Sequence, residues 1–333
     1  GMVVATKEVV TVAWGIVEAL QATRKIIRRI TAHWTGIGKT ADRLTISPHW
    51  LEKAEWPHRI QIDHILQFSG LLLKCYCFVG CATLLWLEKN CGLKDGDKLM
   101  SEKEVVERTT SPLTVLSLTE KLRGCGLAEG QTVLVHLSMS KLGWIVGGAE
   151  AVILALLAAV GDQGTVMMAA HSSNNTDPSI WEHPPVPEAW WQTIRDHTPA
   201  YNPLTTPTRG LGAVPELFRR WPGVIRSTHP NFSLAAVGPQ AEYLLANHVL
   251  DEDSGDRSPL GKLYEVDGHV LLLGVDHGNN SSLHLAEFRA TFPGKRHRLT
   301  GCAMLVNGQR QWVRYKVLDY NADDFEELGA AFD

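Results

Sequence analysis

The sequence lacks the marks of several common protein classes. Its six cysteines form no paired Cys-x-x-Cys arrangement and there is no His-Glu-x-x-His pair, so a zinc site has little support. The Gly-x-x-x-x-Gly-Lys-Ser/Thr motif of P-loop proteins is also absent. No segment at the start has the charged, apolar and small-residue regions of a secretory signal peptide, so we expect a protein of the reducing cytoplasm.

Neither sign of charge is in large excess. The 333 residues carry a formal net charge of −4, which gives no general reason to expect nucleic-acid binding. Residues 1–110 hold 15 Lys and Arg against 12 Asp and Glu, whereas residues 111–333 hold 17 against 24. The acidic second part therefore suits a cationic partner. With 44% apolar and 20% charged residues, the composition excludes a disordered, collagen-like or coiled-coil chain.

Residues 1–110 are expected to form a mainly helical segment of unknown role. Residues 5–31 have apolar side chains at helical spacing, followed by a basic patch that suits a solvated helix end or a membrane or nucleic-acid contact. Residues 65–87 are apolar enough to span a bilayer, but Lys74 lies inside them, so a buried or partner-facing helix is favoured over a membrane segment. Residues 88–112 resemble a linker.

Residues 111–333 alternate between expected strands and helices. Helices are predicted over residues 116–125, 149–160, 212–220 and 282–290, and strands over residues 132–136, 165–170 and 270–275. This order indicates an α/β core with a partly parallel sheet. In such sheets ligands bind beyond the carboxyl ends of the strands, so the polar residues that follow each strand are the candidates for function.

The first two strands are followed by different kinds of polar segment. Residues 136–148 are rich in glycine and serine and precede a helix, which suits an anion such as phosphate or is simply a turn. The second strand is followed by residues 171–182, with two carboxylates, and by an irregular stretch over residues 184–209. Carboxylates beside aromatic rings suit a polycationic ligand, although a solvated surface loop is the alternative.

The third strand is followed by an imidazole and a carboxylate on one helix face. His284 and Glu287 are three residues apart, so the carboxylate can orient and support the imidazole as a general base. Two other interpretations stay open: a surface pair, and a metal site completed by Asp276, His277 or His171. His229 lies in the loop segment Arg226-Ser-Thr-His-Pro and is either structural or part of the site.

From about residue 113 onward, the sequence resembles the aminoglycoside 3-N-acetyltransferases, a family of antibiotic N-acetyltransferases. The stretches that carry the resemblance are VLVHLSMSKLGWIVGGAEAVILALLAAVG, GTVMMAAHSSNNTDPSIWEHPPVPEAWW, NPLTTPTRGLGAVPELFRRWPGVIRSTHPNFSLAAVGP and SPLGKLYEVDGHVLLLGVDHGNNSSLHLAEFRA. The resemblance implies a three-layer α/β fold with a central mixed sheet. It also implies acetyl-CoA as cosubstrate, no metal, and transfer to the 3-amino group of a 2-deoxystreptamine ring, with antibiotic resistance as the outcome.

The resemblance also implies a role for particular residues. The cosubstrate contacts would come from Ser138, Ser140, Gly143, Thr208, Arg209, Gly210 and Ser233. The base and its support would be His284 and Glu287, with His136 and His229 nearby. The aminoglycoside contacts would come from His171, Asp177, Glu182, Tyr201 and Asp276. Because no cysteine falls in these motifs, direct attack on the thioester is expected rather than an acetyl-enzyme.

The sequence departs from the family pattern at two places. Leu137 stands where most members have serine, and Asp276-His277-Gly278 replaces the more usual Gly-His-Asp order. Two alternative functions follow: a metal-dependent hydrolase that uses His171, Asp276, His277 and His284, and a non-catalytic relative that binds CoA. The preferred aminoglycoside, and whether the protein is a monomer or a homodimer, stay open.

Overall fold

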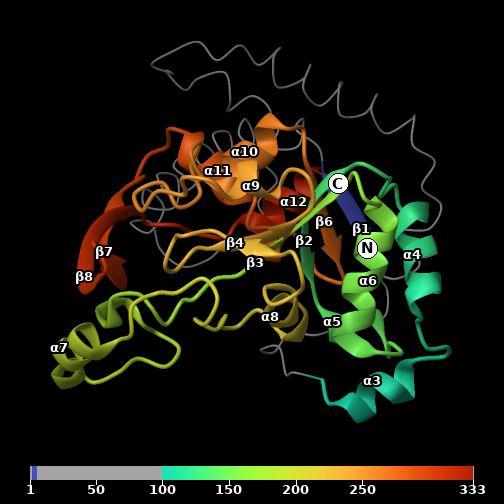
Figure 1. Cartoon of the computed structure of the whole chain (residues 1–333), viewed down its shortest axis with the longest axis horizontal. Coiled ribbons are helices and arrows are strands. Elements are labelled where there is room, and N and C mark those ends of the chain that lie inside the picture. The colour runs from blue at the N-terminus through green and yellow to red at the C-terminus, as the bar shows by residue number, and fades with distance from the viewer. Residues whose placement is uncertain (1, 6–99, 333) are drawn as a thin grey trace, which may run out of the picture. The chain divides into compact units, whose positions relative to one another are not determined.

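The computed structural model describes residues 2–5 and 100–332 of the chain (Figure 1). The apolar run over 65–87 and the basic patch over 24–29 lie outside the described residues, as does the helix expected over 5–31 apart from Ala5. Among the helices of the described ranges, none has the length and apolar character that a membrane crossing needs.

The described residues form eight strands and a set of mostly short helices. The strands are β1 (Met2–Ala5), β2 (Thr132–Leu137), β3 (Thr165–Ala169), β4 (Ile225–Arg226), β5 (Leu234–Val237), β6 (His269–Leu273), β7 (His297–Val306) and β8 (Gln309–Leu318). The α-helices are α3 (Glu102–Arg108), α4 (Val115–Gly124), α5 (Met139–Leu142), α6 (Gly148–Val160), α7 (Glu188–His197), α8 (Ala213–Phe218), α9 (Ala241–Leu245), α10 (Pro259–Glu265), α11 (Leu283–Arg289) and α12 (Phe325–Phe332). Two 3₁₀ turns, η4 (Pro178–Ile180) and η5 (His277–Asn279), lie between them.

A six-stranded mixed sheet forms the centre, in the order β1-β6-β2-β3-β5-β4. Strands β6, β2 and β3 are parallel, whereas β1, β5 and β4 pair antiparallel to their neighbours. The expected α/β core with a mixed sheet is therefore confirmed. Because β6, β2 and β3 point the same way, the residues that follow them meet at one edge of the sheet.

Alternate residues of the strands pack against helices on opposite faces of the sheet. Val133 and Val135 of β2 belong to a core that also contains residues of α4, α6 and α8. Leu134, between them, belongs to a second core with residues of α9, α10 and α11. This two-residue alternation produces the three layers, with α9 and α10 on one side of the sheet and α6 on the other (Figure 1).

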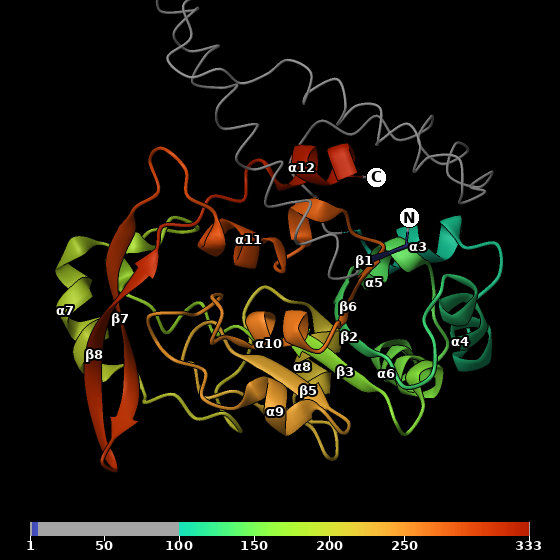
Figure 2. The same ribbon diagram turned by 90° about the horizontal axis from the view of Figure 1, so that it is seen from above.

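A second, two-stranded sheet lies beside α7 and away from the central sheet (Figure 2). Strands β7 and β8 pair over ten residues around a turn at Asn307-Gly308, where both residues have positive φ. The Asn-Gly pair is the strongest short-range signal for such a hairpin, yet sequence analysis missed it. The stretch over 184–209, expected to be irregular, contains α7, and Arg310 of β8 donates to the carbonyl of Thr198.

The expected linker over 88–112 contains a helix. Ser101 and Glu104 form a capping box at the start of α3, which fixes its first turn. At its end, Arg108 Nη2 donates to the carbonyl oxygen of Ser140 at 2.5 Å, and Thr109 Oγ1 accepts from the N–H of Trp144. Helix α3 is therefore packed on the segment that follows β2.

Candidate active site

His284 and Glu287 form a hydrogen-bonded pair in α11. His284 Nδ1 lies 3.0 Å from Glu287 Oε2, and their side chains are 15% and 8% exposed. An ionised carboxylate only accepts hydrogen bonds, so Nδ1 carries the hydrogen. The other ring nitrogen, Nε2, is then the basic one that can take up a proton.

The imidazole of His284 is surrounded by aromatic rings. The ring of Tyr320 lies 4.6 Å away and that of Phe325 lies 4.9 Å away, both at inclined angles. Phe232 presents its edge at 6.1 Å. These rings come from two parts of the chain, the segment just before β5 and the segment from Tyr320 to Phe325, and sequence analysis singled out none of them.

Two further histidines lie at the same edge of the sheet. His136, near the end of β2, places Nε2 3.3 Å from Ser281 Oγ, just before α11. Burial, and next the ring of His284, lowers the pKa of His136 to about 4. His171 follows β3 and stacks on Phe232 at 4.2 Å, and its pKa is lowered to about 3, first by burial and then by the neighbouring histidines. Both rings are therefore neutral at physiological pH.

His229 differs from these histidines because both of its ring nitrogens are engaged by the backbone. Nδ1 accepts from the N–H of Phe232 at 3.0 Å, and Nε2 donates to the carbonyl of Leu250 at 3.3 Å. The side chain is fully buried, and burial lowers its pKa to about 4. Both ring nitrogens are thus used by the backbone, and one of these bonds fixes the turn that carries Phe232.

The segment after β2 is a short helical turn with two adjacent hydroxyls. Ser138 and Ser140 have their Oγ atoms 3.3 Å apart, and both residues are partly exposed. Gly274, just after β6, abuts this turn: with φ at +71°, a side chain there would meet Lys141 Cβ at 3.0 Å and Ser138 O at 3.2 Å. The ends of β2 and β6 therefore touch at the position expected to hold the cosubstrate. Leu137, where most family members have serine, packs against the core instead.

The loop with Thr208, Arg209 and Gly210 is fixed by a carboxylate. Glu216 Oε2 accepts from the N–H of Thr208 at 2.9 Å and from its hydroxyl at 2.7 Å. Burial would raise the pKa of Glu216, but hydrogen bonds from Arg219 and Thr208 lower it to about 2. The Arg209 and Gly210 residues are exposed, and the N–H of Arg209 donates to the carbonyl of His171.

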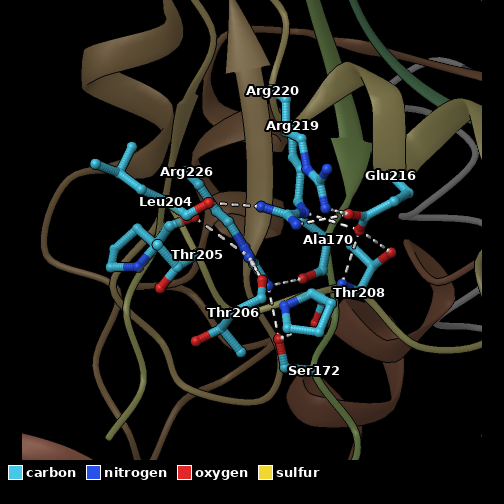
Figure 3. A network of polar contacts seen from close by, with 12 residues as sticks. Ala170, Ser172, Leu204, Thr205, Thr206, Thr208, Glu216, Arg219, Arg220 and Arg226 are labelled. Carbon is cyan, nitrogen blue, oxygen red and sulfur yellow. Dashed lines mark hydrogen bonds and ion pairs between the residues drawn. The ribbon is translucent and has the colours of Figure 1, made fainter.

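A buried guanidinium joins this loop to the sheet (Figure 3). Arg226 of β4 donates to the carbonyls of Ala170 and Thr206 and to the hydroxyl of Ser172 at 2.7 Å. Its Nε donates to Ser233 Oγ at 3.0 Å, and Ser233 in turn donates to Ala170 O. The hydroxyl of Ser233, expected to contact the cosubstrate, is thus buried and hydrogen-bonded to Arg226 and Ala170.

The residues expected to bind the aminoglycoside fall into two groups. Asp177 is buried and accepts two hydrogen bonds from Arg195, at 2.7 and 3.0 Å, so its charge is already compensated. Tyr201 is buried and donates to the carbonyl of Ser227 at 2.8 Å. Glu182 and Asp276, in contrast, are exposed, and Asp276 also caps η5.

Residues 134–333 match the model of the aminoglycoside 3-N-acetyltransferase family. The matched range spans β2, β3, β6 and α11, and so includes the edge of the sheet where His284 and Glu287 lie. The chain belongs to this family. It is therefore an acyltransferase, and acetyl-CoA is the cosubstrate that fits its relatives.

Two relatives illustrate the extent of the similarity. The SPbeta prophage-derived aminoglycoside N(3')-acetyltransferase-like protein YokD of Bacillus subtilis is 47% identical over 232 residues, covering 69% of this chain and 85% of YokD. The aminoglycoside N(3)-acetyltransferase VIII of Streptomyces fradiae is 41% identical over 221 residues, covering 66% of this chain and 76% of the relative.

Three solved structures share the fold. The crystal structure of YokD has a TM-score of 0.67, with 47% identity, over 69% of this chain and 85% of YokD. The binary complex of AAC-IIIb with CoASH has a TM-score of 0.60 at 33% identity, over 67% of this chain and 85% of AAC-IIIb. AAC-VIa bound to sisomicin has a TM-score of 0.57 at 31% identity, over 63% and 78% of the two chains.

A metal-dependent hydrolase would need a metal site, and the described part of the chain contains none. Within residues 2–5 and 100–332, no three side chains of His, Cys, Asp or Glu are gathered so as to hold an ion. His171, Asp276, His277 and His284 are thus not assembled as that alternative required. Of the cysteines in those ranges, Cys125 is exposed and Cys302 is buried, and both are free.

Proposed function

We propose that residues 111–333 transfer the acetyl group of acetyl-CoA to the 3-amino group of the 2-deoxystreptamine ring of an aminoglycoside. Membership of the family supports the reaction class, and the observation that supports the mechanism is the 3.0 Å hydrogen bond between His284 Nδ1 and Glu287 Oε2. It leaves Nε2 as the proton acceptor and provides a carboxylate to stabilise the imidazolium that forms.

An imidazole base is what this reaction requires. An aminoglycoside amine is largely protonated at neutral pH, and only its neutral form has the electron pair that attacks a thioester. The ammonium group first releases one proton to the solvent. In the proposed step, His284 Nε2 takes a second proton as the amine nitrogen bonds to the acetyl carbon. The resulting oxyanion then collapses, the carbon–sulfur bond breaks, and the CoA thiolate leaves with the proton of the His284 imidazolium, which restores the neutral base.

Two segments are proposed to hold acetyl-CoA. The hydroxyls of Ser138 and Ser140 and the backbone at Gly143 lie in the turn that follows β2, which abuts the end of β6. The loop of Thr208, Arg209 and Gly210 is kept in place by Glu216 and Arg226, and the side chain of Arg209 is exposed and positively charged. A cation and backbone N–H groups suit the phosphates of CoA.

The aminoglycoside is proposed to bind through the exposed carboxylates of Glu182 and Asp276 and through His171. Ammonium groups of a polycation pair favourably with such carboxylates, and residues 111–333 are acidic overall. Acetylation of one amine would weaken binding of the drug to its target, which is the expected basis of resistance.

The proposal is tested by measuring thiol release from acetyl-CoA across a panel of aminoglycosides. The panel includes an apramycin-like scaffold and compounds that lack a free 3-amino group. We expect release with 2-deoxystreptamine substrates, loss of release without the 3-amino group, and an N-acetyl product at that position by NMR. CoA binding with no thiol release on any amine would instead support a non-catalytic relative.

A further inference from the structure

Tyr320 joins the active-site pair to a distant part of the chain. It lies between β8 and α12, and its ring centroid is 4.6 Å from that of His284. The ring of Tyr320 also stacks on Phe232, with centroids 6.4 Å apart and an interplanar angle of 23°. The imidazole is therefore in contact with a ring that is itself packed against another ring.

The hydroxyl of Tyr320 is held by two buried residues ahead of α10. It donates a hydrogen bond to Asp253 Oδ1 and is also hydrogen-bonded to Ser254 Oγ. Asp253 is 5% exposed and Ser254 is fully buried. Hydrogen bonds therefore hold the hydroxyl end of the Tyr320 side chain, and they restrict the movement of the ring that contacts His284.

Asn321, the residue after Tyr320, contacts Glu287, the hydrogen-bond partner of His284. The backbone N–H of Asn321 donates to Glu287 Oε1 at 2.9 Å, while Glu287 Oε2 is the oxygen next to His284 Nδ1. Two consecutive residues therefore contact both groups: Tyr320 through its ring and Asn321 through its backbone. Any displacement of Tyr320 would also move the hydrogen bond that orients Glu287.

Such placement matters for catalysis because proton transfer depends on the direction of the imidazole. A displacement of about 1 Å at a reacting group can cost about a hundredfold in rate. We propose that Tyr320, anchored by Asp253, is a positioning residue that holds the His284 imidazole in its catalytic orientation; this rests on the proposed function of His284 as the base.

The test uses Tyr320→Phe and Tyr320→Ala in the full chain, with acetyl-CoA and an aminoglycoside that the wild type acetylates. Tyr320→Phe keeps the ring but loses the anchor, so we expect kcat to fall about threefold to tenfold. Tyr320→Ala loses both, and a fall of about 30- to 100-fold is expected. Both KM values should stay within about twofold of the wild type, because the ring contacts the base.

Two comparisons separate positioning from a merely structural role. Tyr243→Phe is the matched control, because Tyr243 also donates its hydroxyl to a carboxylate, that of Glu265, but at an exposed position. It should leave kcat unchanged. Combining Tyr320→Ala with His284→Ala should add no further loss to that of His284→Ala, because Tyr320 acts through the imidazole.

The outcomes are distinguishable from failure of the proposed function. If the wild type releases no thiol, the proposed function fails. If the wild type releases thiol but His284→Ala retains full turnover, acetyl transfer stands, but His284 is not the base and the positioning role of Tyr320 is overturned with it. If His284→Ala is inactive while Tyr320→Phe and Tyr320→Ala retain wild-type kcat, the positioning role is overturned. It is overturned equally if Tyr320→Ala lowers kcat by the same factor with and without His284. A melting curve for each variant confirms that the protein compared is folded.

Discussion

The backbone N–H of Asn321 and the side chain of Glu287 meet across 34 residues of sequence, at 2.9 Å. Because this bond occupies Oε1 and His284 Nδ1 lies against Oε2, each carboxylate oxygen has one partner. These two hydrogen bonds fix the orientation of the Glu287 carboxylate toward the imidazole of His284. His284 and Glu287 are close in sequence, but the orientation of their side chains depends on the segment between β8 and α12.

Removing the base should abolish most of the activity without unfolding the protein. We expect His284→Ala to lower kcat at least about a hundredfold, because general-base catalysis contributes about 10²–10⁴ in rate. Steady-state kinetics and a melting curve check this. The matched control is His297→Ala, at an exposed histidine at the start of β7, which should retain full turnover. Near-normal turnover of His284→Ala would remove the base from the mechanism.

Crowding the turn after β2 should weaken binding of acetyl-CoA. Gly274→Ala introduces a Cβ that meets Lys141 Cβ at 3.0 Å and Ser138 O at 3.2 Å, so the turn must shift. We expect the KM for acetyl-CoA to rise on the order of tenfold, which corresponds to about 1.4 kcal/mol.

The control for this prediction is Gly294→Ala. Gly294 also has positive φ, at +92°, but a Cβ there meets nothing within 4 Å. Both variants carry a similar backbone strain of about 1–2 kcal/mol, so only Gly274→Ala tests the contact with the turn. Equal KM values for the two variants would mean that this turn does not hold the cosubstrate.

Arg226 should contribute more to stability than a surface arginine. Arg226→Met removes the guanidinium hydrogen bonds to the carbonyls of Ala170 and Thr206 and to the hydroxyls of Ser172 and Ser233, although Ala170 keeps the bond from Ser233. Hydrogen bonds to a charged group contribute about 1.5–3 kcal/mol each, so we expect the free energy of unfolding to fall by about 3 kcal/mol or more. Urea denaturation measures it.

The matched substitution is Arg220→Met. Arg220 pairs with Glu216, as Arg219 does, but its side chain is 60% exposed. Exposed pairs contribute about 0–1 kcal/mol, so we expect almost no change. Comparable losses from Arg226→Met and Arg220→Met would show that the buried network in Figure 3 is not a major source of stability.

Buried neutral histidines should make the fold sensitive to acid. The pKa of His136 is lowered to about 4, whereas the unfolded chain takes up this proton near pH 6.5. Below about pH 6.5 the unfolded state therefore binds more protons than the folded state, and stability falls until about pH 4. The loss from this residue is on the order of 3 kcal/mol.

The measurement is the free energy of unfolding from pH 7.5 to pH 4.5 for the wild type and His136→Asn. The variant should lose less stability than the wild type over this interval, because it lacks one of the titrating groups. His297→Asn, at an exposed histidine, should follow the wild-type curve. Parallel curves for the wild type and His136→Asn would contradict the prediction.

The core elements could be predicted because their signals are local. Apolar runs marked β2, β3 and β6, and helical periodicity marked α4, α6 and α11, each to within one or two residues. The pairing of His284 with Glu287 was also predictable, since residues three apart share a helix face. The hairpin at Asn307-Gly308 had a clear local signal that went unused.

Other features could not be derived from spacing. Asp177 was expected to face the substrate, yet it pairs with Arg195, 18 residues away. His229 was expected near the base, and the spacing gave no sign that the backbone at Phe232 and Leu250 engages both of its nitrogens. In each case the hydrogen-bond partner depends on how the loops fold back on the sheet. The residue's type and its sequence neighbours do not predict that path.

The sequence by itself determined the mixed α/β core, the edge where the parallel strands end, and the imidazole–carboxylate pair placed there. Periodicity and strand order are properties of neighbouring residues, so they are readable without a structure. Only the tertiary structure decided which polar groups are hydrogen-bonded inside the protein, and that Tyr320 and Asn321 contact His284 and Glu287. These contacts join segments that are tens of residues apart in sequence, so they form only when the chain has folded and brought those segments together.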